Sequence, residues 1–100
     1  MIVFVVYYYE HYDDYKRAES SGDVVNVFTN EEDAYKCAVD NFIKMFSYYE
    51  YDYDYFMHTD LSYKEQYDII KEKLYTDILP EAEYTMQPSY KNYFVKEFKI

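Results

Sequence analysis

The chain has 100 residues, of which 24% are aromatic and 30% charged, and twenty acids against ten bases give it a net charge of −10. The length suits a single domain, 1–100, and the aromatic content excludes the aromatic-poor composition of a disordered chain. A field of this sign repels phosphate backbones and anionic membranes and attracts basic proteins, so we expect neither direct nucleic-acid binding nor membrane binding.

The cysteine content and the N-terminal sequence both favour the cytoplasm. Cys37 is the single cysteine and cannot form an internal disulfide, so nothing requires an oxidising compartment. The opening MIVFVVYYYEH has an apolar run too short to span a bilayer, and it lacks the basic region and cleavage site of a signal peptide. We therefore expect a soluble, cytoplasmic protein.

The first third of the chain predicts two strands joined by a long loop. Residues 2–10 are β-branched and aromatic on both alternating faces, which indicates a central strand covered on both sides. The polar residues 11–23 end in Ser-Ser-Gly-Asp, a loop signal, and residues 24–29 follow as a second strand. The pair is expected to form a hairpin.

A capping box predicts the first helix. Thr29 and Glu32 have the spacing at which a hydroxyl and a carboxylate bind the free backbone donors of a helix start. The helix should begin near Glu31 and end around residues 47–50. Its apolar stripe consists of Ala34, Cys37, Ala38, Phe42, Met45, Phe46 and Tyr49.

A second capping box, Ser62 with Glu65, predicts a helix that Pro80 stops. The apolar side of this helix consists of Tyr63, Tyr67, Ile70, Leu74 and Ile78. The charged residues expected to face solvent are Lys64, Lys71 and Lys73, with Asp68 and Glu72.

The last residues, 92–100, predict a final strand that carries Phe94, Phe98 and Ile100 on one face, and residues 84–87 would add a short fourth strand. The order β-β-α-α-β predicts an α+β domain, in which two helices lie on one face of an antiparallel sheet of three or four strands. The last strand should pair with the first, because a strand that is apolar on both faces is best protected in the middle.

One stretch of the chain resembles the start of small phage-type proteins. Residues 2–38 run from an apolar-aromatic strand through an acidic, Tyr-bearing loop into VVNVFTNEEDAYKCA, with a similar "VF…EE.A…A" turn between strand and helix. The resemblance covers about two fifths of the chain. It implies the fold and a viral origin, and it carries over no catalytic residue.

The residues with catalytic or metal-binding chemistry form no recognisable site. His11 with Asp13 and Asp14 would begin a metal site, but His58 is the only other histidine and no paired-ligand spacing is present. Cys37 lies on an apolar helix stripe, where an inert thiol is expected. A chain with one glycine has no glycine-rich phosphate loop. We therefore expect no enzyme, no cofactor and no metal.

The most unusual stretch is YYEYDYDYF, residues 48–56. If extended, it places Glu50, Asp52 and Asp54 on one side at intervals of about 6.6 Å and the tyrosines on the other. Such a carboxylate row imitates a phosphate track, and tyrosine rings offer planar contact where bases would lie. Lysines and arginines of a nucleic-acid-binding surface would pair with the carboxylates and stack on the rings. The alternative is a solvated acidic connection between helices.

In composition the chain resembles the acidic nucleic-acid mimics that phages and other viruses use against restriction or CRISPR effectors. We therefore expect a non-enzymatic inhibitor that occupies the basic nucleic-acid channel of a nuclease or CRISPR effector in the host cytoplasm. The expected contact residues are Glu50, Tyr51, Asp52, Tyr53, Asp54 and Tyr55, supported by Asp13, Asp14, Glu31, Glu32 and Asp33.

Two other classes of function remain open. The first is a homo-oligomeric interaction module, such as a homodimer, in which the exposed members of seventeen tyrosines and an open strand edge join the subunits. The second is a metal-dependent enzyme built around His11 and Asp13.

Overall fold

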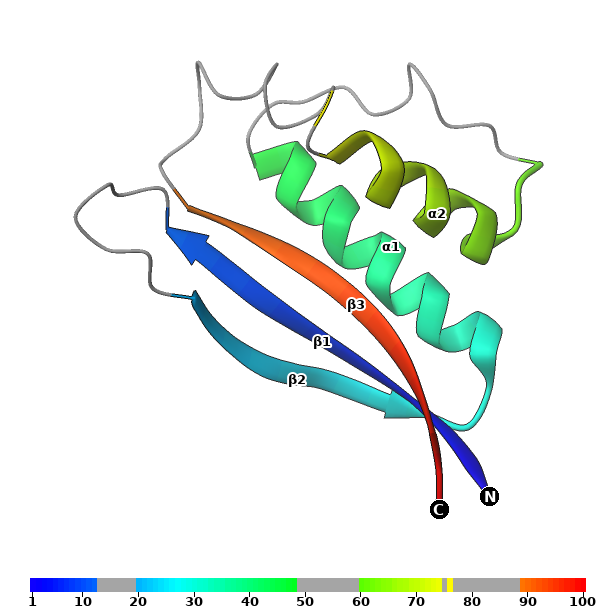
Figure 1. Ribbon diagram of the computed structural model, residues 1–100. Coiled ribbons are helices and arrows are strands. Elements are labelled where there is room, and N and C mark those ends of the chain that lie inside the picture. Colours follow the sequence, from blue (N-terminus) through cyan, green and yellow to red (C-terminus); the bar gives the residue numbers. More distant parts are fainter. Residues whose placement is uncertain (13–19, 49–59, 75, 77–88) are drawn as a thin grey trace.

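The computed structural model describes residues 1–12, 20–48, 60–74, 76 and 89–100. In chain order its elements are β1 (Ile2–Tyr12), β2 (Ser20–Phe28), α1 (Glu31–Tyr48), α2 (Tyr63–Lys73) and β3 (Ser89–Lys99). The strands form one antiparallel sheet in the order β2-β1-β3 (Figure 1). The predicted α+β class, the element order and the central place of the first strand are confirmed.

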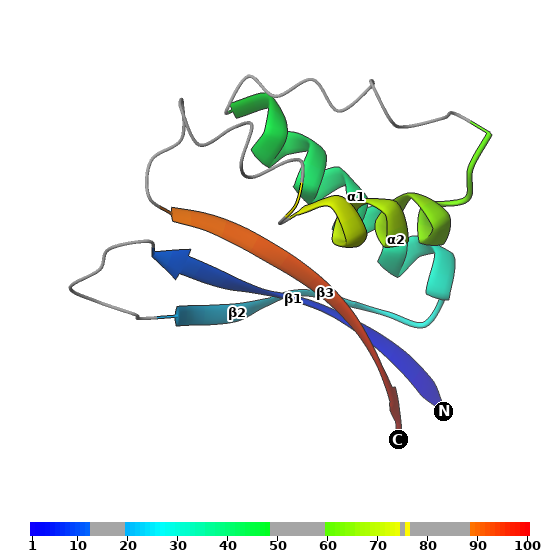
Figure 2. The same cartoon turned by 45° about the horizontal axis from the view of Figure 1, so that its top comes forward.

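Both helices lie on the same side of the sheet, α1 across the strands and α2 beside it toward the β3 edge (Figures 1 and 2). Ala34 and Ala38 are fully buried, which lets the start of α1 approach the strands closely, and Phe42 fills the space further along. The buried core consists of Val6, Ala34, Ala38, Val39, Phe42, Phe46, Ile70, Leu74 and Tyr93. The core therefore lies between α1, α2 and one face of the sheet.

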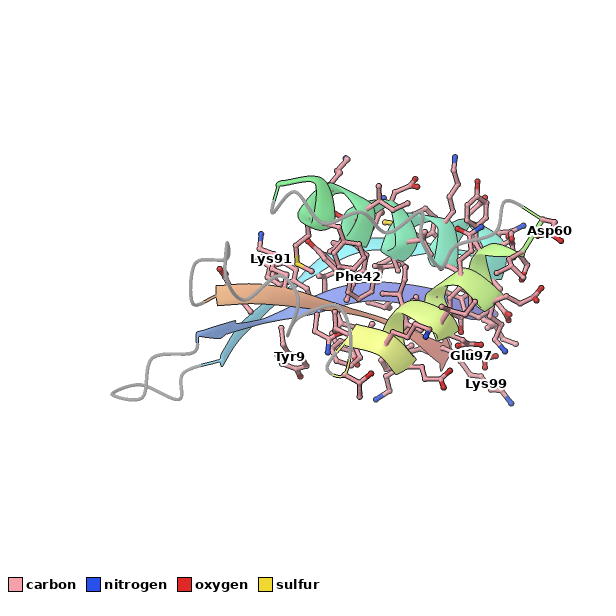
Figure 3. The ribbon with its side chains drawn as sticks, turned by 90° about the horizontal axis from the view of Figure 1, so that it is seen from above. Tyr9, Phe42, Asp60, Lys91, Glu97 and Lys99 are labelled. Carbon is pink, nitrogen blue, oxygen red and sulfur yellow. The ribbon has the colours of Figure 1, made fainter. Side chains whose placement is uncertain are left out.

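The prediction that the first strand is covered on both sides holds in part: on its second face Val3 is buried and Val5 and Tyr7 are half-buried, whereas Tyr9 is exposed. Directly opposite residues of an antiparallel pair share a face, so Tyr8 and Tyr93 point toward α1, whereas Tyr7 and Phe94 point away from it. Both described helices lie on the first face (Figure 1), and from α2 the Lys71 ammonium reaches over the Phe94 ring on the second. Figure 3 shows Phe42 on the α1 side of the strands and Tyr9 on the opposite side. The outward side chains of β1 are also apolar because they pack on one another and on β3, as the rings of Tyr7, Tyr9 and Phe94 do.

The loop signal Ser-Ser-Gly-Asp lies inside a strand, which corrects the sequence prediction. Gly22 pairs with Tyr9, and β2 already begins at Ser20. A Cβ added at Gly22 would lie 2.6 Å from the Tyr8 carbonyl oxygen and 3.0 Å from a ring carbon of Tyr9. The glycine is therefore present for close approach to the neighbouring strand, and not for a turn.

The capping box of α2 is confirmed, whereas that of α1 is wrong. The Ser62 hydroxyl accepts from the Glu65 backbone N–H at 3.2 Å, and the Glu65 carboxylate accepts from the Ser62 N–H at 3.3 Å. Helix α1 begins at Glu31 as predicted, but its first turn is capped by Asn30, whose side-chain oxygen accepts from the backbone N–H of Asp33 at 3.2 Å.

The carboxylate of Glu32 is used elsewhere, because it accepts from the backbone N–H of Tyr63 at 3.1 Å. It thereby connects the start of α1 to the start of α2.

Three predictions lie outside the described residues: the strand at 84–87, the helix end at Pro80 and the apolar residue Tyr49. Neither α1 nor α2 combines the length and the apolar character that crossing a membrane requires.

Candidate interaction surfaces

Most of the predicted contact residues lie outside the described part of the chain. They are Asp13 and Asp14, together with the row Glu50, Tyr51, Asp52, Tyr53, Asp54 and Tyr55. His11 is described only by its backbone in β1, and His58 is outside. Glu31, Glu32 and Asp33 form the exposed first turn of α1, where carboxylates stabilise the helix dipole. The structure therefore gives this acidic turn a structural role.

The net charge is divided unevenly between the described and the remaining residues. The described residues hold eleven acids and eight bases, a net charge of −3 out of the −10 of the whole chain. Segments 49–59 and 77–88 together hold six acids and neither Lys nor Arg. The described residues thus carry the smaller part of the net charge, and the larger part belongs to the rest of the sequence.

A second surface is the side of the sheet that faces away from the helices, which we call the open sheet face. It consists of the buried Val3 and Asn92 together with Val5, Tyr7, Tyr9, Val24, Val27, Phe94, Lys96 and Phe98. Four of its apolar side chains keep much of their surface in solvent: Tyr9 (45%), Val24 (54%), Val27 (50%) and Phe98 (42%). Single exposed apolar residues are ordinary, but neighbours on adjacent strands form a patch.

The aromatic rings of the open sheet face are packed on one another. The Tyr7 ring stacks on Phe94 with centroids 5.3 Å apart, and the Tyr9 ring meets both at 5.8 Å, edge to face. Such pairs each contribute about 0.5–1.5 kcal/mol beyond burial. The patch is therefore a fixed surface. The sequence carried a signal for it, namely the apolar residues on both alternations of the first strand.

Helix α2 closes the free edge of β3. The Tyr67 hydroxyl donates to the Tyr93 carbonyl oxygen at 3.3 Å, and the Lys71 ammonium donates to the same oxygen at 3.2 Å and to the Asn92 side-chain carbonyl. Burial raises the pKa of Tyr67 to about 12, although a backbone hydrogen bond from Val95 acts in the opposite direction. These side chains occupy positions that a further strand would need.

Lys71 was expected to face solvent, and this prediction is wrong. Its ammonium lies 3.6 Å from the ring centroid of Phe94 and 5.9 Å from that of Phe42, so the side chain reaches around the edge of β3. Burial lowers the pKa of Lys71 to about 8, because the charged form loses hydration. The helical period places Lys71 one turn after Tyr67, at the border of the apolar side of α2, and the neighbouring sheet edge makes it a contact residue.

The other edge of the sheet, β2, is protected by its own side chains. The backbone N–H of Val24 donates to the Asp23 carboxylate at 2.7 Å, and that of Val27 donates to the Asn26 side-chain oxygen at 2.8 Å. The pairing with β1 is also shifted by a bulge between Val6 and Tyr7. Because two of its backbone N–H groups are already hydrogen-bonded and its pairing contains a bulge, this edge is a poor template for the addition of another strand.

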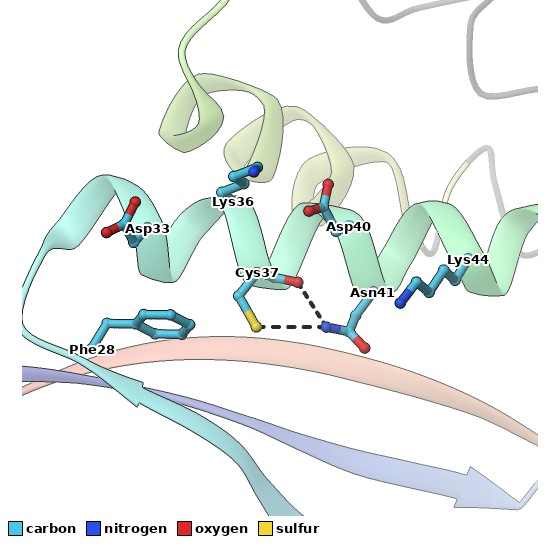
Figure 4. Close-up of a pocket in the computed structure, with 7 residues that line it drawn as sticks. All are labelled: Phe28, Asp33, Lys36, Cys37, Asp40, Asn41 and Lys44. Atoms are coloured by element: carbon cyan, nitrogen blue, oxygen red, sulfur yellow. Dashed lines mark hydrogen bonds between the residues drawn. The ribbon is translucent and has the colours of Figure 1, made fainter.

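A groove between α1 and the end of β2 surrounds Cys37. The residues lining it are Phe28, Asp33, Lys36, Cys37, Asp40, Asn41 and Lys44. Cys37 and Asn41 point toward the sheet, whereas Lys36 and Asp40 point away from it (Figure 4). Burial, and next the nearby Asp40 carboxylate, raise the pKa of the free Cys37 thiol, so the nucleophilic thiolate is disfavoured.

The described residues offer no metal centre, because nowhere among them do three or more His, Cys, Asp or Glu side chains gather as ligands. Comparison of the chain with protein-family models, with curated proteins and with solved structures found no match. The function is therefore inferred from two features of the chain, the acidic segments 49–59 and 77–88 and the open sheet face.

Proposed function

We propose that this protein is a non-enzymatic acidic inhibitor that binds the basic nucleic-acid-binding surface of another protein. The observation that supports this proposal is the division of charge. The described residues have a net charge of only −3, whereas segments 49–59 and 77–88 hold six acids and neither Lys nor Arg. Acids arranged to stabilise a fold would be interspersed with bases, as they are on α2.

One described attachment point of each acidic segment lies toward the same end of the sheet. His11 pairs with Ser20 and Tyr12 with Ser89, so the described residues next to 13–19 and 77–88 lie at one end of the sheet. Helix α1 also ends toward this end, at Tyr48, where segment 49–59 begins (Figure 1). Carboxylates that start from neighbouring points act on a partner as one field within a Debye length of about 8 Å.

Inhibition would occur by competition. The carboxylates of Glu50, Asp52 and Asp54 pair with Lys and Arg side chains that otherwise bind phosphates, and counterions leave both surfaces. The adjacent tyrosine rings stack on guanidinium groups and supply contact area at low entropy cost. The acidic field also accelerates the encounter with a basic cleft. No bond is made or broken, so the activity requires neither a metal nor a cofactor.

A capture experiment tests this function. The protein is immobilised and exposed to a cell lysate at low salt, and retained proteins are eluted first with duplex DNA and then with high salt. We expect nucleic-acid-binding proteins in the DNA eluate, because protein and DNA compete for the same basic surface. Retained proteins that neither duplex DNA nor salt releases would contradict the proposal.

Matched charge reversals test where the contact lies. Asp52→Lys with Asp54→Lys should weaken binding to a captured protein by at least about tenfold and flatten its salt dependence. The control is Asp68→Lys with Glu72→Lys, which changes the net charge equally on the exposed side of α2. Equal losses from both pairs would show that net charge alone matters and would remove residues 50–55 from the contact.

A further inference from the structure

The open sheet face points to a binding partner that the acidic segments do not explain. Val24 and Val27 are half exposed on β2, Tyr9 on β1 and Phe98 on β3, so the exposed apolar surface extends across all three strands. Burying this surface would contribute roughly 25 cal/mol per Å² of apolar area. We propose that the open sheet face binds the same face of a second copy of this chain, forming a dimer.

The charges of the described strands fit this occupant. The three carboxylates of β1, β2 and β3, Glu10, Asp23 and Glu97, pair in register with Lys91, Tyr8 and Phe4, on the α1 side of the sheet. None of the described carboxylates belongs to the open sheet face. Two copies can therefore meet there without opposing two acids, despite a net charge of −10 on each chain.

The two ammonium groups at this face, Lys96 and Lys71 over Phe94, both lie at the β3 edge and are compatible with a neutral, aromatic partner. The Lys96 ammonium lies 5.2 Å from the Phe98 ring centroid, so its stem runs along apolar surface while its charge stays at the rim. Lys96 is on β3, an edge strand. It therefore does not place a charge at the centre of the contact, which β1 occupies with Val5, Tyr7 and Tyr9.

The geometry of the sheet favours pairing through the face over pairing through the edges. Tyr67 and Lys71 cover the edge of β3, and Asp23 and Asn26 bind backbone donors of β2. Among the described residues both edges thus have hydrogen-bonded groups, whereas Tyr9, Val24, Val27 and Phe98 of the face remain exposed. Dimerisation of this kind replaces the strand-edge contact expected from the sequence by sheet-on-sheet packing.

The size of the face is sufficient for a weak dimer. Strands β1 and β3 have 11 residues each and β2 has nine. With a rise of about 3.3 Å per residue and about 4.8 Å between strands, the outline of the face measures roughly 35 by 14 Å, about 500 Å², and the buried Val3 and Asn92 reduce the part open to a partner. Two copies would bury at most about 1,000 Å², the lower end for a specific interface. We expect a dissociation constant in the micromolar range.

Sedimentation analysis over a wide concentration range tests this inference. Wild-type protein should pass from monomer to dimer, and higher salt should favour the dimer because it screens the repulsion between two acidic chains. Val27→Glu should raise the dissociation constant at least about tenfold, since it buries an unpaired carboxylate in the contact. The matched control, Asn26→Asp, adds the same charge to the neighbouring residue and keeps the acceptor for the Val27 N–H, so it should leave the constant unchanged.

Val24→Lys separates burial from charge repulsion. This variant reduces the net negative charge, so it would strengthen a dimer limited by repulsion, but it should weaken one that buries the open sheet face. It also replaces Val27→Glu if circular dichroism shows that the glutamate variant is unfolded. A wild-type protein that stays monomeric at about 500 μM, or equal effects of Val27→Glu and Asn26→Asp, would overturn the inference. The salt dependence opposes that of the proposed inhibitor complex, so either idea can fail without the other.

Discussion

The two faces of the sheet carry similar residue types but have different surroundings. On the α1 side, Val6 and Phe42 are fully buried. On the open sheet face, Val24 and Val27 keep about half of their surface exposed. An apolar, alternating strand thus reveals that both faces carry apolar side chains, but it does not reveal which face a helix covers. The comparison teaches that hydrophobic pattern alone does not distinguish a core from a contact surface.

Lys71 belongs to both regions, because its ammonium lies near Phe42 on one face and Phe94 on the other. The position of α2 at the β3 edge makes this possible. One lysine therefore couples the packing of the core to the packing of the aromatic patch. Four substitutions test how the two faces differ in their contribution to the free energy of unfolding, in order of decreasing expected effect.

The sharpest contrast is between a core residue and a residue of the open sheet face. Phe42→Ala should lower the free energy of unfolding by about 3–5 kcal/mol, because it empties the centre of the core. Val27→Ala, at a half-exposed position, should cost less than about 1 kcal/mol in a dilute monomer. Urea unfolding measures both. Similar costs would mean that the open sheet face is as buried as the core.

Gly22→Ala tests close packing within the open sheet face itself. The new Cβ would lie 2.6 Å from the Tyr8 carbonyl oxygen, so the strands must separate. We expect a loss of about 2 kcal/mol in the free energy of unfolding. Val24→Ala on the same strand should cost less than half as much. A neutral Gly22→Ala would show that β2 is free to move away from β1.

Lys71→Met tests the residue that joins the two faces, through the pH dependence of stability. With a pKa of about 8 in the folded protein and 10.5 when unfolded, Lys71 loses its proton first in the folded state as pH rises. Between pH 8 and 10.5 the unfolded state binds more protons, so wild-type stability should rise with pH.

The expected rise relative to Lys71→Met is about 1–2 kcal/mol, because solvent screens the partly exposed ammonium. The measurement is the difference between the two proteins in urea unfolding from pH 7 to 10. Both proteins keep Tyr67, whose pKa near 12 makes the folded state retain a proton that the unfolded state releases above pH 10, so this contribution cancels in the difference. Parallel pH curves for both proteins would show that Lys71 is hydrated.

Ser62→Ala tests the smallest contribution, the cap of α2. Loss of the hydroxyl that accepts from the Glu65 N–H should cost about 1 kcal/mol, whereas Ser62→Asp keeps an acceptor and should cost little. Amide hydrogen exchange should accelerate at Tyr93 and Val95, on the edge that α2 protects, and remain unchanged in β2. Equal acceleration in β2 would show that the cap stabilises the fold as a whole.

Local features of the fold were predictable from short stretches of the chain. The Ser62 and Glu65 pair marks the start of α2, and the stripe through Ala34, Ala38 and Phe42 marks the buried side of α1. Both depend on contacts within a few residues or on a simple period. The central place of β1 followed from its apolar character on both faces.

Other features were not predictable, because they depend on residues distant in sequence. Glu32 binds the backbone of Tyr63, which leaves the first cap to Asn30. Ser-Ser-Gly-Asp pairs with residues 8–11 although its composition favours a loop, since unpaired backbone groups of β1 require a partner. Of the predicted contact residues, only the first turn of α1 is among the described residues, and Glu32 there serves the fold.

The amino-acid sequence by itself determined the element types, the position of the α2 cap and the excess of acids in segments 49–59 and 77–88, because each depends on local spacing or composition. Only the tertiary structure decided which face of β1 is covered, that Lys71 is partly buried and that both sheet edges are occupied. The physical reason is that burial is a property of the neighbours a side chain meets, and those neighbours come from α2 and β3, far along the chain.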